Sequence, residues 1–212
     1  MPTLTKLDPI QGLEFNEEQH VYTFNGKPVP ASVTSICSFD MDDRARERIE
    51  STRDDWEPRG NHLHAMCEQW WLGAAQLDPG PYAEWSDALF DHPLFKNYSP
   101  LAVEHRFVDK RGRYAGSCDF IIQGPGKDGK DRVLLCDLKT KRSTTSKVGD
   151  HRKQLGAYVR MCNQHYPTLI IDKCVIVNSF PGRVDLTVHD PDECVAAWDE
   201  QWGKYEAWQP AF

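Results

Sequence analysis

The spacing of apolar residues changes near residue 100, and this change limits the folds open to the chain. Over residues 60 to about 75 the apolar side chains recur at helical spacing, which predicts a helix with one buried stripe. Over 101–108, 113–123 and 131–140 they alternate with polar residues, and Val, Ile, Phe and Tyr are enriched, which predicts three successive strands. The glycine-rich segment 124–130 predicts a hairpin between the second and third strands.

The segments on either side of these elements follow helix and strand patterns as well. Residues 20–37 alternate around Asn25-Gly26, which predicts a hairpin followed by a helix. The charged residues 42–54 predict a solvated helix or a mobile arm that ends at Pro58. Later patterns predict a helix over 146–166, strands over 168–180 and 182–189, and a closing helix from Pro191. The central order is therefore helix, three strands, helix, strand.

This order indicates the α/β (α+β) class, with a central mixed sheet flanked by helices. A chain of 212 residues is long enough for one substantial domain, and we expect a single domain over 1–212. Within it, 1–59 would form an N-terminal hairpin and helical arm, 60–180 the core, and 181–212 a C-terminal strand and helix.

Composition narrows the class of protein further. The formal charge of −7 excludes a basic tail or a histone-like coat for nucleic acid. No run of 18 apolar residues is present, so no membrane span and no membrane partner are expected. The N-terminus has no apolar stretch typical of a signal peptide, and the seven cysteines have irregular spacing. We therefore expect free thiols and a cytoplasmic location.

Four short motifs occur in order along the predicted core. Spacing of four places Gly60, His64 and Glu68 on one face of the first helix. The later motifs are Gly116-x-x-Asp119 in the second strand, Asp137-x-Lys139 at the end of the third strand, and the co-facial pair Gln154 and Tyr158 on the next helix.

Each motif also has an ordinary structural interpretation. A lone helical His is often structural, Asp119 can face water, Asp137 and Lys139 can form a surface salt bridge, and Gln154 with Tyr158 can belong to any amphipathic helix. The predicted hairpin, however, brings Asp119 next to Asp137. Two adjacent carboxylates repel each other and are most readily explained by a divalent cation between them.

Taken together, the four motifs resemble the RecB-type branch of the PD-(D/E)XK nuclease superfamily over about residues 60–180. Residues 22–36 are also similar to the N-terminal segment of phage-encoded exonucleases and of the mitochondrial genome maintenance exonuclease in that branch. The resemblance implies a restriction-endonuclease-like core with the order αβββαβ, and it makes 60–180 the catalytic core.

The resemblance also implies roles for the motif residues. His64, Asp119, Asp137 and the main-chain carbonyl of Leu138 would bind one or two Mg²⁺ or Mn²⁺ ions. Lys139 would orient or deprotonate the attacking water. Three groups would assist: Gln154 and Tyr158 by positioning the DNA strand or steadying Lys139, and Glu68 as a supporting acid. Glu104 on the first core strand is either a further acid near the metals or a surface carboxylate.

Two features depart from the family pattern. Residue 118 is Cys where the superfamily name leads one to expect Pro, a position whose side chain the chemistry does not use. Some relatives hold an iron-sulfur cluster, but Cys162, Cys174 and Cys194 are too dispersed here, so no cluster is expected.

Positive charge is concentrated beside the third strand. Residues 139–153 hold six of the 25 Lys and Arg and one of the 32 Asp and Glu, which gives this stretch +5 and the rest of the chain −12. A positive rim beside a metal site would attract phosphates; the alternative is a solvated loop. The candidate DNA-binding residues are Lys141, Arg142, Lys147, Arg152 and Lys153.

The expected function is a metal-dependent DNA exonuclease that hydrolyses phosphodiester bonds from free ends of single- or double-stranded DNA. It would act in phage or bacterial recombination, repair or DNA degradation, in the host cytoplasm if phage-encoded. A single-strand annealing or binding protein would be a partner. Two alternatives remain: an endonuclease or flap nuclease of the same fold, and a catalytically silent DNA- or protein-binding module.

Overall fold

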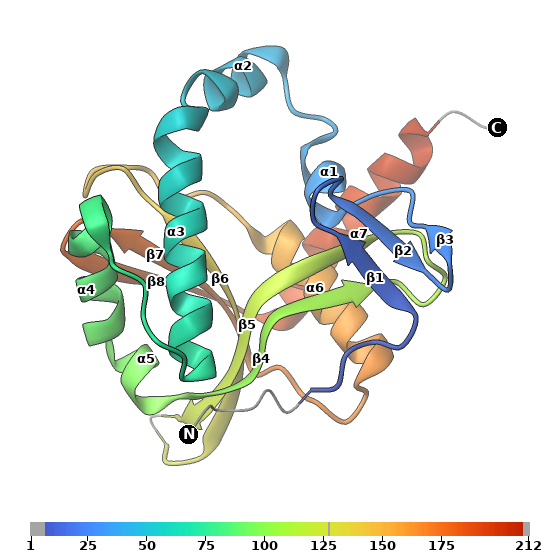
Figure 1. The fold of residues 1–212 in the computed structure, drawn as a ribbon. Coiled ribbons are helices and arrows are strands. Elements are labelled where there is room, and N and C mark those ends of the chain that lie inside the picture. Colours follow the sequence, from blue (N-terminus) through green and yellow to red (C-terminus); the bar gives the residue numbers. More distant parts are fainter. Residues whose placement is uncertain (1–6, 127, 210–212) are drawn as a thin grey trace.

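Five strands form one mixed sheet in the order β4-β5-β6-β7-β8 (Figure 1). The computed structural model describes residues 7–126 and 128–209; the first six residues of the predicted N-terminal segment, residue 127 of the predicted hairpin and the last three residues of the chain lie outside this description. Neighbouring strands are antiparallel except β6 and β7, which are parallel. The strands are β4 (Ser99–Val108), β5 (Ala115–Pro125), β6 (Asp131–Thr140), β7 (Lys173–Phe180) and β8 (Arg183–His189).

Helices cover both faces of this sheet, so the fold is a mixed α+β arrangement with a flanked central sheet (Figure 1). On one face, α6 (Arg152–His165) and α7 (Pro191–Trp208) pack with α1 (Val33–Ser38) over a buried apolar cluster. On the other face, a second cluster joins the sheet to α3 (Arg53–Leu72), α4 (Ala83–Asp91) and α5 (Pro93–Asn97), with the short η1 (Gly80–Tyr82) before α4. The three predicted strands, their hairpin and the helix that links β6 to parallel β7 are confirmed.

A small three-stranded sheet stands beside β4 and β5. It consists of β1 (Leu13–Asn16), β2 (Val21–Phe24) and β3 (Lys27–Pro28). Asn25 and Gly26 both have positive φ, 52° and 74°, in the two-residue turn between β2 and β3, as expected for a hairpin turn of this sequence. β1 was not predicted, because its apolar and polar residues alternate over only four positions, too short a pattern to be recognised.

The helical arm differs from the prediction. It consists of α2 (Asp43–Ser51) followed by α3, and Pro58 lies inside α3 instead of ending a helix. A proline there removes one main-chain hydrogen bond. The buried neighbour Arg59 anchors this turn, because its Nε donates to Thr140 Oγ1 and its guanidinium lies 5.6 Å from the centre of the Trp85 ring. The predicted boundary between residues 59 and 60 therefore falls within a continuous helix.

The helix predicted over 146–166 starts later, at Arg152. Residues 141–151 form a loop, and the Asp150 carboxylate accepts a hydrogen bond from the Arg152 main-chain N–H. The seven cysteines are unpaired thiols. Among the described helices, none has both the length and the apolar character needed to cross a lipid bilayer.

Candidate metal centre

The candidate site lies where β5 and β6 separate. Their antiparallel ladder ends at Phe120 opposite Cys136. Beyond this pair β5 continues beside β4, and β6 continues beside β7. Asp119 on β5 and Asp137 on β6 are the first residues beyond the Phe120–Cys136 pair. One Asp119 carboxylate oxygen, Oδ2, accepts the main-chain N–H of Leu138, which has lost its strand partner on this side.

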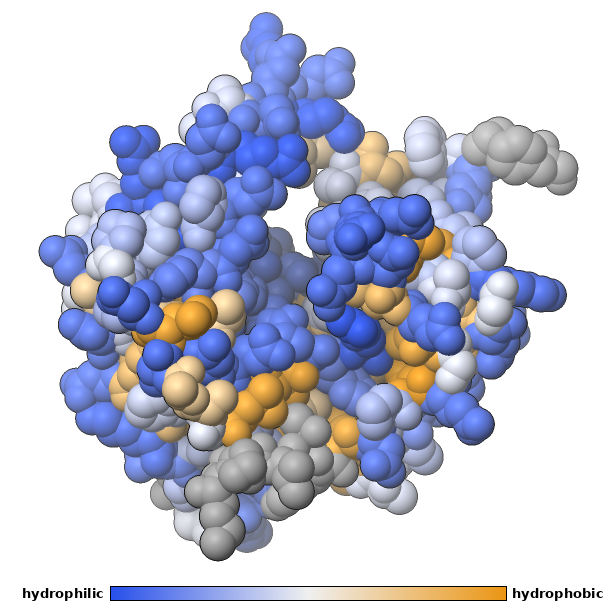
Figure 2. All heavy atoms as spheres, in the orientation of Figure 1, coloured by the Kyte–Doolittle hydropathy of each residue, from blue (hydrophilic) through white to orange (hydrophobic). Residues whose placement is uncertain are grey.

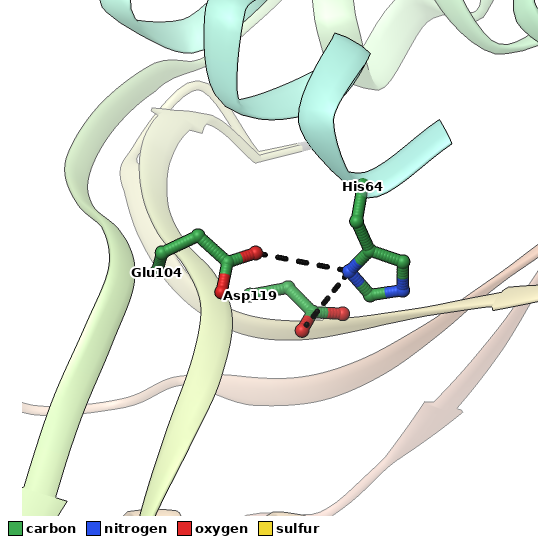
Figure 3. Close-up of side chains that lie close together, drawn as sticks. All are labelled: His64, Glu104 and Asp119. Carbon is green, nitrogen blue, oxygen red and sulfur yellow. Dashed lines mark ion pairs between the residues drawn. The ribbon is translucent and has the colours of Figure 1, made fainter. Parts of the chain in front are cut away.

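Glu104 lies opposite Asp119 on β4. Its neighbours pair in register, Val103 with Phe120 and His105 with Cys118. Glu104 itself has a φ of 45°, a left-handed conformation that non-glycine residues rarely adopt inside a strand. The side chain is directed to the same place as that of Asp119, across from α3 (Figure 3). This local irregularity therefore adds a second carboxylate to the fork, the place where β5 and β6 separate.

The third member, His64, comes from α3, which crosses over β4 and β6 (Figure 1). Leu63 and Cys67 face the apolar core, so His64 and Glu68 are turned toward the fork. His64 Nδ1 lies 3.5 Å from Asp119 Oδ1 and 3.7 Å from Glu104 Oε1 (Figure 3). One ligand atom from each of these three residues lies within 4.8 Å of the others.

Charge is poorly balanced in this cluster. The pKa of Asp119 is raised to about 7, chiefly by burial; His64 and Lys139 oppose the rise, and nearby Asp137 and Glu104 add to it. Burial alone would lower the pKa of His64, but Asp119, Glu104 and Asp137 raise it to about 9. Buried carboxylates that are not fully neutralised by protein cations are what a bound divalent ion would stabilise.

The donor set also fits such an ion. Carboxylate oxygens suit Mg²⁺ and Mn²⁺, whereas imidazole nitrogen favours later transition metals. Two carboxylates with one imidazole therefore fit Mn²⁺ somewhat better than Mg²⁺.

Asp137 and Lys139 form the second part of the site. Lys139 Nζ lies 2.7 Å from Asp137 Oδ2, and the Asp137 side chain is 1% exposed. Burial tends to lower the pKa of Lys139, but Asp137 and Asp119 raise it overall. Lys139 is therefore a stable ammonium, better suited to orienting water and phosphate than to removing a proton. Asp137 is not part of the close cluster, which contains Glu104 in its place.

Tyr158 differs from the expectation, because it is a core residue. Its side chain is 2% exposed, and its hydroxyl accepts a hydrogen bond from Gln154 Nε2 at 3.2 Å. A Cβ on Gly116 would lie 3.1 Å from Cε1 of this ring and 3.0 Å from Val33 Cγ2. Gly116 thus allows α1 and α6 to approach β5, and only Gln154 of the pair is left to reach a substrate.

Gly60, the first residue of the first motif, is not required for close packing of α3. A Cβ on Gly60 would lie 4.0 Å from Thr140 Oγ1, an ordinary contact, so the approach of α3 to β6 does not require glycine at this position. Glu68 lies beside the cluster. Burial, together with the charges of Glu104 and Glu17, raises the pKa of Glu68.

The five candidate DNA-binding side chains divide into two groups. Arg152 pairs with Asp150 at 2.7 Å, and Lys153 Nζ donates to Gln201 Oε1 at 2.5 Å. Lys141 is half-buried, and burial next to Lys139 lowers its pKa. Arg142, at 77% exposure, lies 3.6 Å from Asp55, and the exposed Lys147 projects from the loop. Fewer side chains are therefore available for a positive rim than the sequence suggests.

Sequence reasoning underestimated one functional candidate, Glu104. The alternation of β4 alone gives no sign of the positive φ that redirects this side chain. A usable signal would have been the position of Glu104 in the predicted ladder, directly across from Asp119.

Comparison with known proteins gives little further information. No protein-family model matches the chain, and no curated protein matches it. Among solved structures, the one described as the crystal structure of SSO0001 matches with a TM-score of 0.40 and 16% identity, over 82% of this chain and 75% of that chain. A similarity of this size assigns neither a family nor an activity.

Proposed function

We propose that this chain is a divalent-metal-dependent DNA exonuclease with a restriction-endonuclease-like core of the PD-(D/E)XK type. The observation that carries the proposal is the fork between β5 and β6. It gathers His64, Glu104 and Asp119 into a cluster and places the Asp137–Lys139 pair beside it. The order of α3, β4 to β6, α6 and β7 is consistent with the αβββαβ order that the sequence motifs imply.

His64, Glu104 and Asp119 would hold the ion, and Asp137 and the carbonyl of Leu138 remain candidate ligands for the same or a second ion. When bound, a divalent ion supplies a hydroxide nucleophile at neutral pH and offsets charge on the phosphate.

The side chains of the site have separate tasks in this proposal. The Lys139 ammonium, held by Asp137 at 2.7 Å, would orient the attacking water and attract the scissile phosphate. The Asp119 carboxylate keeps its position because the Leu138 N–H binds its other oxygen. Gln154, fixed by Tyr158, would contact the DNA strand near Lys139.

The test is digestion of 5′- and 3′-labelled linear oligonucleotides, single- and double-stranded, with Mg²⁺, Mn²⁺ or EDTA. We expect nucleotides to be released from one end with a metal and not with EDTA. Asp119→Asn and Lys139→Met should each lower the rate by roughly 10²-fold or more. Asp131→Asn and Lys130→Met, at the opposite end of β6, are the matched controls and should keep full activity.

The same experiment separates the alternatives. A circular single-stranded substrate must stay intact if the enzyme requires an end, whereas an endonuclease cuts it. A silent binding module would release no nucleotide from any substrate and would show no heat of Mn²⁺ binding at the cluster. Wild-type rates in both Asp119→Asn and Lys139→Met would refute the proposal.

A further inference from the structure

A cavity of about 520 Å³ adjoins the candidate metal centre. His64 and Glu104 belong both to the metal cluster and to the lining of this cavity. Figure 2 shows the surface hollowed between the small sheet and α3, with hydrophilic residues on both sides. A phosphate held at the cluster would therefore leave the sugar and base attached to it at the mouth of this cavity.

The wall formed by the small sheet carries aromatic and cationic groups packed together. The ring of Phe15 lies 4.4 Å from the ring of Tyr22 and 5.8 Å from that of His20, between ring centres. Arg106 on β4 holds its guanidinium carbon 5.1 Å from the centre of the Phe15 ring. Its Nη2 also donates to Glu17 Oε1 at 3.1 Å, which fixes the plane of the guanidinium. Aromatic rings and fixed Arg planes are the groups on which proteins stack unpaired bases.

The small sheet is tied to the floor of the cavity. The Tyr22 hydroxyl and Ser117 Oγ lie 3.1 Å apart, and Ser117 is two residues from Asp119 on β5. The stacking wall is thus held at a set position relative to the metal cluster. The opposite wall is polar, since Asn61 and Glu68 on α3 face the cavity. An amide and a carboxylate there can bind the N–H groups on the edge of a base.

We propose that this cavity binds the nucleoside attached to the scissile phosphate, with its base unpaired and stacked on the Phe15–Arg106 wall. The volume lies in the range of about 300–1,000 Å³ typical of small-molecule sites, and a base can stack on this wall only after it has left the base stack of a duplex. The proposal rests on the proposed nuclease function and adds its substrate class: a DNA end that is single-stranded at the cleaved nucleotide.

The experiment compares a normal single-stranded oligonucleotide with one that carries an abasic residue at the attacked end. Wild-type kcat/KM for release of the first nucleotide should fall about tenfold on the abasic end, since stacking of one base is worth about 1–3 kcal/mol. Phe15→Leu should slow the normal substrate by a similar factor and should show no further loss on the abasic one. Phe24→Leu, on the same small sheet but outside this cavity, should behave like the wild type.

Binding gives a readout that does not depend on turnover. With Mn²⁺ present, a deoxynucleoside monophosphate should bind the wild type more tightly than deoxyribose 5-phosphate, and Phe15→Leu should remove the difference. Equal cleavage of normal and abasic ends, or an abasic penalty that persists in Phe15→Leu, would overturn the inference while leaving the nuclease proposal intact. Base-dependent binding without cleavage of any substrate would retain the cavity site and refute the proposed nuclease function instead.

Discussion

Glu104 combines backbone strain with a side chain of the candidate metal cluster. A non-glycine residue in a left-handed conformation costs of order 1–3 kcal/mol and persists only where its surroundings impose it. Glu104 adopts it between Val103 and His105, which both remain paired with β5. The left-handed conformation places the Glu104 carboxylate across from His64. The free-energy cost of this conformation therefore accompanies formation of the cluster.

This link predicts a difference between two substitutions at Glu104. Glu104→Gln and Glu104→Asn remove the same charge, but Asn tolerates the left-handed region better than Gln. We expect the Asn variant to be more stable than the Gln variant by about 1 kcal/mol in chemical denaturation of the metal-free protein. Both should lose Mn²⁺ binding by calorimetry. Equal stability of the two variants would mean that the backbone at this position is not strained.

The lowered pKa of His105, the next residue, predicts how the stability of the fold depends on pH. Burial, with a smaller contribution from His165, lowers the pKa of His105 to about 4 from an ordinary value of 6.5. Its ring pairs with the Tyr166 hydroxyl at 2.9 Å. Because the unfolded chain takes up a proton near pH 6.5 and the folded chain does so only near pH 4, stability should fall as pH drops between these values.

The predicted loss from His105 is roughly 2 kcal/mol between pH 8 and pH 5. His105→Gln keeps a neutral side chain at both values and should lose correspondingly less stability than the wild type over this range. Urea denaturation at the two pH values measures the difference. His20→Gln, at an exposed position, is the control and should follow the wild type.

At the scale of elements, α6 and α7 approach each other unusually closely. A Cβ built on Gly156 of α6 would overlap the main-chain carbonyl of Cys194 in α7. Main-chain atoms cannot move aside as a flexible side chain can, so the two helices would have to separate. Both helices cover the same apolar cluster on one face of the sheet, and their separation would open that cluster.

We therefore expect Gly156→Ala to destabilise the fold by about 1–3 kcal/mol or more. Gly203→Ala is the matched control, because it lies in α7 with no atom within 4 Å of its Cβ. It should instead stabilise the protein by about 0.5–1 kcal/mol through helix propensity. Thermal unfolding followed by circular dichroism distinguishes the two, and the same sign of change in both variants would contradict this account.

The strands and the hairpin turns could be predicted because their patterns are local. The strand patterns of β4 to β6, over 10, 11 and 10 residues, and the Asn25-Gly26 turn each carry their own signal. The passage of α3 through Pro58 could not be predicted in this way, because a lost main-chain hydrogen bond is offset by distant contacts of Arg59 with Thr140 and Trp85. Tertiary contacts outweighed local propensity there.

The candidate site was predictable to a similar extent. Sequence motifs identified His64, Asp119 and Lys139, and the hairpin correctly placed Asp119 near Asp137, as the end of the ladder shows. Glu104 could not be given more weight from the sequence, because its orientation depends on a positive φ that the alternation of β4 does not reveal. The burial of Tyr158, which packs against Gly116, could not be predicted from the spacing of Gln154 and Tyr158 alone.

For the whole molecule, charge is segregated. The chain carries −7 overall, yet residues 139–153 carry +5. Part of that positive charge is neutralised within the protein, by Asp150 on Arg152 and by the ion pair of Asp137 with Lys139. Arg142 and Lys147 extend from the loop that follows β6, and Arg142 remains 77% exposed although Asp55 lies 3.6 Å from it. The available positive charge is thus small and concentrated on one side of the site.

This distribution predicts how the proposed DNA binding depends on salt. Each phosphate contact to a single strand adds about 0.7 to the slope of log K against log salt concentration. Arg142→Gln combined with Lys147→Gln should therefore lower the slope by about 1.4 and weaken binding equally for all sequences. Lys96→Gln with Lys130→Gln removes the same charge at the far end of the sheet and should leave the slope unchanged. Fluorescence anisotropy with a labelled oligonucleotide over a range of salt concentrations measures both. If the two double variants lower the slope equally, binding responds to net charge and not to a local rim.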